Sequence, residues 1–193
     1  SNQIAQKSKF VDIAVSDFGV YALLDKTKGR VFIYDFEGDL LNIFGSSGDL
    51  KGNVKNPTGI AWLGKKLLIS DRDLGVCYLY EPTEFGETVL NAAEQYYKGN
   101  WNNAGKLFDE TVKLNANYDV GYTGVGRNYL MQDQYEKAMY YLKLGNSKSY
   151  YSKAYNGYRS LAIQKYIGWF AALFLLITFT LFYSEYKYNK KNG

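Results

Sequence analysis

An uncharged run of 19 residues, positions 166–184, constrains this chain more than any other feature. A helix of that length extends about 28 Å, which matches the hydrocarbon core of a bilayer. Aromatic residues near its ends and lysines beside it are typical of membrane anchors. These residues are Tyr166, Trp169, Tyr183, Lys187, Lys190 and Lys191. The run predicts a single transmembrane helix, and a buried helix of a soluble protein is the alternative.

The segment before this run repeats at a spacing of 34 residues. The recurring pairs are Trp101 and Tyr135, Ala104 and Ala138, and Phe108 and Leu142. Small residues such as Gly126 and Ala138 allow two helices to cross closely. The spacing resembles that of tetratricopeptide (TPR) repeats, which are stacked helical hairpins. The resemblance implies a protein-binding array, and an ordinary helical bundle is the alternative.

The first part of the chain has a longer period. Short runs of β-branched and aromatic residues, separated by Gly and Asp turns, predict strands across residues 10–89. Asp25 and Asp71 lie 46 residues apart, as do Tyr34 and Tyr80. A period in the forties with four strands per unit is typical of β-propeller blades.

The sequence of this part is similar to the NHL repeat, both in residues 25–38 and in the phrase Asn-Pro-Thr-Gly-Ile-Ala at 56–61. The resemblance implies a partial NHL-type propeller of about two blades. Two blades alone would leave apolar faces and strand edges in water. We therefore expect the remaining blades to precede residue 1, and an isolated pair of sheets resting on the helices is the alternative.

These patterns predict a multi-module chain that runs from β to α. No flexible linker separates the blades from the repeats, so we expect the two to abut with a fixed geometry. The predicted modules are an N-terminal remnant of a longer chain (1–9), the blades (10–89), the TPR-like hairpins (90–150), a capping or connecting helix (151–165), the transmembrane helix (166–184) and a basic tail (185–193).

Composition excludes several classes of function. The chain has no histidine and one cysteine, which rules out internal disulfides, His or multi-Cys zinc sites and histidine-based triads. We expect Cys77 to be a small buried hydrophobe in a strand. The net charge of +4 comes from interspersed lysines and acids, so nucleic-acid binding is not expected. We expect no cofactor and no metal.

Many aspartates fall at predicted turns of the blade region. Asp side chains accept hydrogen bonds from nearby backbone amides in turns, so a capping role is favoured over metal binding. A site for calcium or another hard cation is the alternative. The aspartates are Asp12, Asp17, Asp25, Asp35, Asp71 and Asp73.

The TPR resemblance also implies where a partner would bind. In that family the first helix of each repeat lines a concave groove. The register places Thr123, Arg127 and Met131 in this groove, with Tyr97 one repeat earlier. We expect Arg127 to be exposed there, because a guanidinium can bind a partner's carboxylate through two parallel hydrogen bonds.

We therefore predict a membrane-anchored protein-binding scaffold or accessory subunit and not an enzyme. Chains with these modules resemble bacterial accessory components of ABC-type transport systems, which implies a membrane or surface partner such as a permease. The alternative is the C-terminal part of a lactonase-like or lyase-like propeller enzyme whose active site lies upstream.

Charge leaves the topology open, because Lys153, Arg159 and Lys165 balance the three lysines beyond the uncharged run. The tail carries its lysines within fewer residues. We expect a single-pass plasma-membrane protein with a cytoplasmic tail and extracytoplasmic repeats, and the alternative is a tail-anchored protein facing the cytoplasm.

Overall fold

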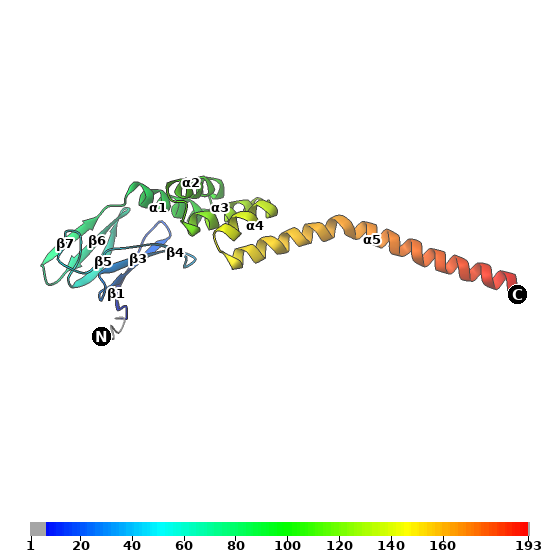
Figure 1. Ribbon diagram of the computed structural model, residues 1–193, viewed down its shortest axis with the longest axis horizontal. Helices are drawn as coiled ribbons and strands as arrows, with labels where there is room; N and C mark the ends of the chain where they lie inside the picture. The colour runs from blue at the N-terminus through cyan, green and yellow to red at the C-terminus, as the bar shows by residue number, and fades with distance from the viewer. Residues whose placement is uncertain (1–6, 193) are drawn as a thin grey trace.

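The computed structural model describes residues 7–192, in which strands come first and helices follow (Figure 1). The first six residues of the predicted remnant 1–9 lie outside this range. The strands are β1 (Phe10–Val15), β2 (Val20–Asp25), β3 (Arg30–Asp35), β4 (Leu40–Phe44), β5 (Pro57–Leu63), β6 (Lys66–Asp71) and β7 (Val76–Tyr80). The helices are α1 (Glu84–Tyr97), α2 (Trp101–Leu114), α3 (Asp119–Met131), α4 (Tyr135–Leu144) and α5 (Lys148–Asn192).

The strands form two small antiparallel sheets, one of order β1-β2-β3-β4 and one of order β5-β6-β7. Tight turns join neighbouring strands. The β3–β4 turn contains Gly38 at a φ of 88°, a conformation that glycine adopts without a steric penalty. The predicted β-then-α order is confirmed, and the described residues form two sheets and no closed propeller.

Three strands end on a buried aspartate: Asp25 on β2, Asp35 on β3 and Asp71 on β6. In each case one carboxylate oxygen accepts the backbone N–H of the residue two positions later, at 3.0–3.1 Å. Burial alone would raise the pKa of Asp25 and Asp71, but bonds from backbone amides outweigh it and hold both pKa values below the ordinary value. The predicted capping role is confirmed for these three.

The two sheets share hydrogen bonds and strand irregularities that recur after 46 residues. Asp25 Oδ1 accepts a hydrogen bond from Lys9 N at 3.0 Å, and Asp71 Oδ2 accepts one from Lys55 N at 2.6 Å. Near their starts, β1 and β5 each carry an irregularity in their pairing with the next strand. The 46-residue period therefore corresponds to two equivalent sheet units.

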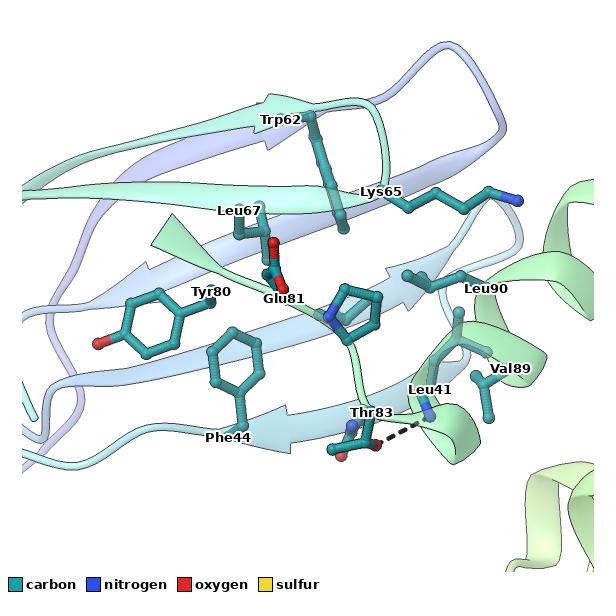
Figure 2. Close-up of a pocket in the computed structure, with 14 residues that line it drawn as sticks. Leu41, Phe44, Trp62, Lys65, Leu67, Tyr80, Glu81, Thr83, Val89 and Leu90 are labelled. Carbon is teal, nitrogen blue, oxygen red and sulfur yellow. Dashed lines mark hydrogen bonds between the residues drawn. The ribbon is translucent and has the colours of Figure 1, made fainter. Parts of the chain in front are cut away.

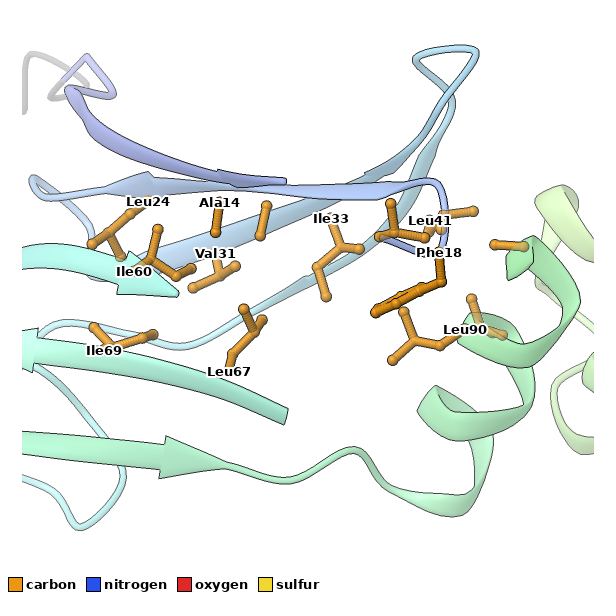
Figure 3. Close-up of a cluster of buried hydrophobic side chains, with 14 of the residues drawn as sticks. Ala14, Phe18, Leu24, Val31, Ile33, Leu41, Ile60, Leu67, Ile69 and Leu90 are labelled. Atoms are coloured by element: carbon orange, nitrogen blue, oxygen red, sulfur yellow. The ribbon is translucent and has the colours of Figure 1, made fainter. Parts of the chain in front are cut away.

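The sheets pack face to face through aliphatic side chains (Figure 3). Leu24 and Val31 of the first sheet lie in the same buried cluster as Ile60 and Ile69 of the second. Leu90 of α1 joins this cluster at one end, so the sheets and the first helix share a single core. This shared core fixes the contact between the strand region and the helical region, as the sequence predicts.

Each helix packs on the next one along the chain. Thr83 caps α1, because its Oγ1 accepts the backbone N–H of Gly86 at 3.2 Å. Glycine and alanine lie where helices cross: a Cβ added to Gly124 would lie 2.2 Å from the Phe108 ring, and Ala138 is fully buried. These small residues are needed for close helix contact, as the sequence indicates.

Helix α5 is 45 residues long and leaves the rest of the fold after its first turns (Figure 1). Near its start it packs on α4 through the buried Ala154 and through Gly157, which lies against the Tyr135 ring. The predicted capping helix, the predicted transmembrane helix and residues 185–192 of the predicted tail are parts of this one helix, and no proline interrupts it. Residues 166–184 are exposed along nearly their whole length.

Cys77 is exposed, so its predicted burial is wrong. It pairs with Ser70 across the β6–β7 ladder, whereas Ile69 beside Ser70 belongs to the buried cluster. Because side chains alternate along a strand, Cys77 faces away from the first sheet. Sequence pattern alone does not reveal which face of a strand is covered.

We expect Gly126→Ala to reduce the stability of the full chain by about 1–3 kcal/mol through overpacking. The new Cβ would lie 2.6 Å from Leu142 Cγ on α4. Chemical denaturation in detergent micelles, followed by tyrosine and tryptophan fluorescence, measures the change. Gly86→Ala is the matched control, because its Cβ would lie 3.4 Å from the nearest neighbouring atom. Equal stability of the two variants would contradict the packing described for α3 and α4.

Candidate functional site

The residues predicted to line one binding groove do not share a surface. Tyr97 and Met131 are about half exposed, at the ends of α1 and α3. Thr123 is buried, and its hydroxyl donates to the carbonyl oxygen of Gly145 at 3.1 Å. Arg127 is only 3% exposed, so its predicted position on a free surface is wrong.

Arg127 instead binds the turn between β3 and β4, which carries three carboxylates. Its Nη1 lies 3.0 Å from Glu37 Oε2 and 3.5 Å from Asp35 Oδ2, and its Nη2 contacts Asp39. A planar guanidinium suits such multiple carboxylate contacts. The predicted chemistry of Arg127 is therefore present, but the carboxylates come from this chain. We call Arg127 and these three acids the arginine clamp.

Two tyrosine rings cover the arginine clamp. The Tyr96 ring of α1 lies 5.2 Å from the Arg127 guanidinium carbon, and the Tyr150 ring of α5 lies 4.2 Å from it. The Tyr150 hydroxyl also donates to Glu37 Oε2 at 2.5 Å. Cation–π contacts of this kind stabilise a desolvated guanidinium. The clamp thus joins the first sheet to α1, α3 and α5.

Burial and neighbouring charges shift the pKa values of the groups at the arginine clamp. Burial raises the pKa of Asp35, although the N–H of Asp39 and the charge of Arg127 act in the opposite direction. Burial alone would lower the pKa of Arg127, but the neighbouring tyrosines and carboxylates raise it above its ordinary value. Burial and the bond to Glu37 raise the pKa of Tyr150. The guanidinium stays charged.

The same three acids are the candidate ligands for a hard cation. One oxygen from each of Asp35, Glu37 and Asp39 lies within 4.8 Å of the others. Arg127 contacts all three carboxylates, so a cationic group of the protein already holds this position. The arrangement supports an internal ion-pair network and gives no support to the alternative of a calcium site.

A cavity of about 190 Å³ lies between the two sheets and the start of α1 (Figure 2). Its walls include Phe44, Trp62 and Tyr80, with the Phe44 and Tyr80 ring centroids 5.4 Å apart. Lys65 and Glu81 supply charges at the cavity, and both are paired, with Glu94 and Lys66 respectively. These walls suit an apolar group. Sequence reasoning missed the cavity because its walls come from distant segments.

The predicted membrane-anchor residues lie on α5. Tyr166, Trp169 and Tyr183 are exposed, Trp169 at 78%. Lys187 and Lys190 follow on the last turns of the helix, and the side chain of Lys191 lies outside the described part of the chain. Within residues 7–192, α5 is the one helix long and apolar enough to cross a membrane. Its apolar segment is not buried against the protein.

Comparison with known proteins gives no family for this chain. No family model matches it, and no curated protein matches it. Among solved structures, the chain is similar to the computationally designed Ika4 protein, with 16% sequence identity and a TM-score of 0.30. The match covers 40% of this chain and 44% of the designed protein, so the chain spans less than half of that structure. A likeness this weak supports no argument about fold or function.

We expect Arg127→Ala to destabilise the fold by about 3–5 kcal/mol, because it leaves the buried carboxylate of Asp35 without its cation. Thermal or urea denaturation of the full chain in detergent measures this loss. Arg127→Lys should recover part of the stability, since an ammonium restores the charge but not the planar contacts. The exposed Arg72→Ala is the control. If Arg127→Ala proves as stable as Arg72→Ala, the clamp does not hold the fold together.

Proposed function

We propose that this chain is a membrane-anchored protein-binding scaffold or accessory subunit. The observation that carries the proposal is the exposed apolar segment 166–184 of α5, which continues directly from a helix packed on the folded part. A long apolar helix of this kind is costly to leave in water. We infer that α5 crosses the bilayer and that the sheets and α1–α4, here called the head, bind a partner.

The coupling between α5 and the head supports a scaffold over a flexible tether. Tyr150 and Ala154 hold the first turns of α5 against the head, through the arginine clamp and through α4 respectively. Rigid attachment fixes the orientation of a bound partner relative to the membrane. It also lowers the entropy lost when that partner binds.

The proposal extends to the repeat families. The equivalent aspartate bonds of the two sheets, 46 residues apart, favour the NHL interpretation. Consecutive helices with small residues at their crossings favour the TPR interpretation. Proteins of both kinds bind other proteins, and the resemblance to transport-system components points to a membrane partner such as a permease. We propose a plasma-membrane location with the head extracytoplasmic and the basic tail cytoplasmic.

Residues 166–184 should hold the full chain in the membrane fraction after carbonate washing, because transfer of this segment to water is unfavourable. A chain lacking residues 166–193 should appear in the soluble fraction, since the head has its own core. Circular dichroism of the shortened chain is the control for folding. If the shortened chain is folded and still pellets with carbonate-washed membranes, residues 166–193 are not the membrane anchor.

We expect affinity capture of the full chain from gently solubilised membranes of its source cells to recover a membrane protein in near-equal amount. Quantitative mass spectrometry after mild crosslinking measures the ratio. An unrelated single-pass protein with the same tag and expression level controls for detergent co-micelles. A full chain that recovers nothing beyond this control would contradict the scaffold proposal, whatever the result for membrane attachment.

A further inference from the structure

The first sheet is apolar on both of its faces. Its inner face packs on the second sheet, and its outer face carries two apolar rows that cross all four strands by the observed register. An antiparallel sheet with one face in water normally has polar residues on that face. The rows are Ile13, Leu23, Phe32 and Ile43, and Val15, Tyr21, Tyr34 and Leu40.

This outer face is open to solvent in the described structure. Val15 is 74% exposed, Ile13 is 53% exposed and Ile43 is 42% exposed. None of them belongs to a buried cluster. A contiguous apolar surface of this kind marks a contact site.

The 46-residue repeat shows what covers an equivalent surface. A shift of 46 residues maps Leu23 to Ile69 and Tyr34 to Tyr80, and a shift of 47 maps Ile13 to Ile60. In the second sheet these residues lie on the inner face, where they pack against the first sheet. Over strands β1–β3, the outer face of the first sheet is therefore the counterpart of the inner face of the second sheet, which the first sheet covers.

We propose that the outer face of the first sheet is a docking surface for a further antiparallel sheet built from the same 46-residue unit. That sheet would present small and branched aliphatic side chains, as the inner face of the first sheet presents Val20, Ala22 and Leu24 to the second. This inference rests on the proposed function of the head as a protein-binding scaffold, and it names the surface and the chemistry of the partner.

A second copy of this chain fits the surface poorly in a head-to-tail contact. Such a contact would bring the outer face of its second sheet onto this surface, and there Lys66, Ser70 and Cys77 stand at the positions equivalent to Val20, Leu24 and Val31. A symmetric contact between the outer faces of two first sheets is distinguished by the test below. Lys66 is ion-paired with Glu81. Burying Lys66 against Val15 or Tyr21 would remove a charge from water without a new partner, which is costly.

The test inserts a duplicate of residues 9–54, one complete unit, before Lys9 of the full chain in detergent micelles. Ile13→Cys in a Cys77→Ser background reports on the outer face of the original first sheet, because Ile13 is exposed whereas its counterpart Ile60 is buried. We expect the duplicate to slow maleimide labelling of this cysteine by about tenfold or more, because a covered thiol reacts only when the contact opens. Circular dichroism confirms that the inserted unit is folded.

Two controls make the result specific. Leu50→Cys in the same background should label at one rate with and without the duplicate, since Leu50 is 76% exposed in the β4–β5 connection. In a separate chain that keeps its native cysteine, Cys77 should also label rapidly, because the outer face of the second sheet stays open.

Three results would overturn the inference. An unchanged rate at position 13 in the presence of a folded duplicate would mean that the face does not accept such a sheet. In a reporter chain without the duplicate, slow labelling of the cysteine at position 13 together with a dimeric mass would identify a second copy as the occupant. If the labelling of that cysteine becomes slower as the detergent concentration rises, the occupant is detergent and the face binds lipid-like molecules. Membrane attachment and partner capture are measured independently, so this inference can fail while the proposed function stands.

Discussion

The guanidinium of Arg127 lies where four parts of the chain meet. The β3–β4 turn supplies its carboxylates, Tyr96 of α1 and Tyr150 of α5 supply aromatic faces, and α3 carries Arg127 itself. A buried charge is tolerated only when it is paired, so each of these parts restricts the positions of the others. The clamp complements the apolar cluster of the sheets and α1, which Val120 of α3 also contacts, because it adds α5 to the same region.

This arrangement changes the meaning of Arg127 for function. An arginine on a helix surface is available to a partner, whereas Arg127 binds acids from a turn 88 residues earlier in the chain. Contact with a partner therefore falls to surfaces that the clamp leaves open. The outer face of the first sheet is an apolar surface for which the internal repeat indicates a specific covering element. For the cavity near Phe44 and Trp62, no comparable repeat argument shows what would fill it.

Local patterns predicted much of the fold, and long-range contacts account for what they missed. Strand alternation, turn aspartates such as Asp25 and Asp71, and small helix-crossing residues such as Ala138 act over a few neighbouring residues, so the sequence reveals them. The burial of Arg127 depends on a turn that is distant in sequence, although three acids within five residues were a visible signal. The exposure of Cys77 depends on which sheet face is covered. That question has no local answer, and the same limitation applies to the outer face of the first sheet.

The continuity of α5 links the clamp to the membrane in the proposed topology. Tyr150 contacts the clamp and Tyr166 begins the uncharged segment, and 16 residues of helix between them span about 24 Å. Helix α5 is continuous over this distance, although it changes direction between its first turns and its C-terminal part (Figure 1). Because its first turns are fixed to α4 and to the Arg127 region, a tilt of the anchor would be transmitted to the sheets instead of being absorbed in a linker. In that topology the proposed docking surface would be connected to the anchor by a continuous helix, which would suit a partner that is itself fixed in the membrane.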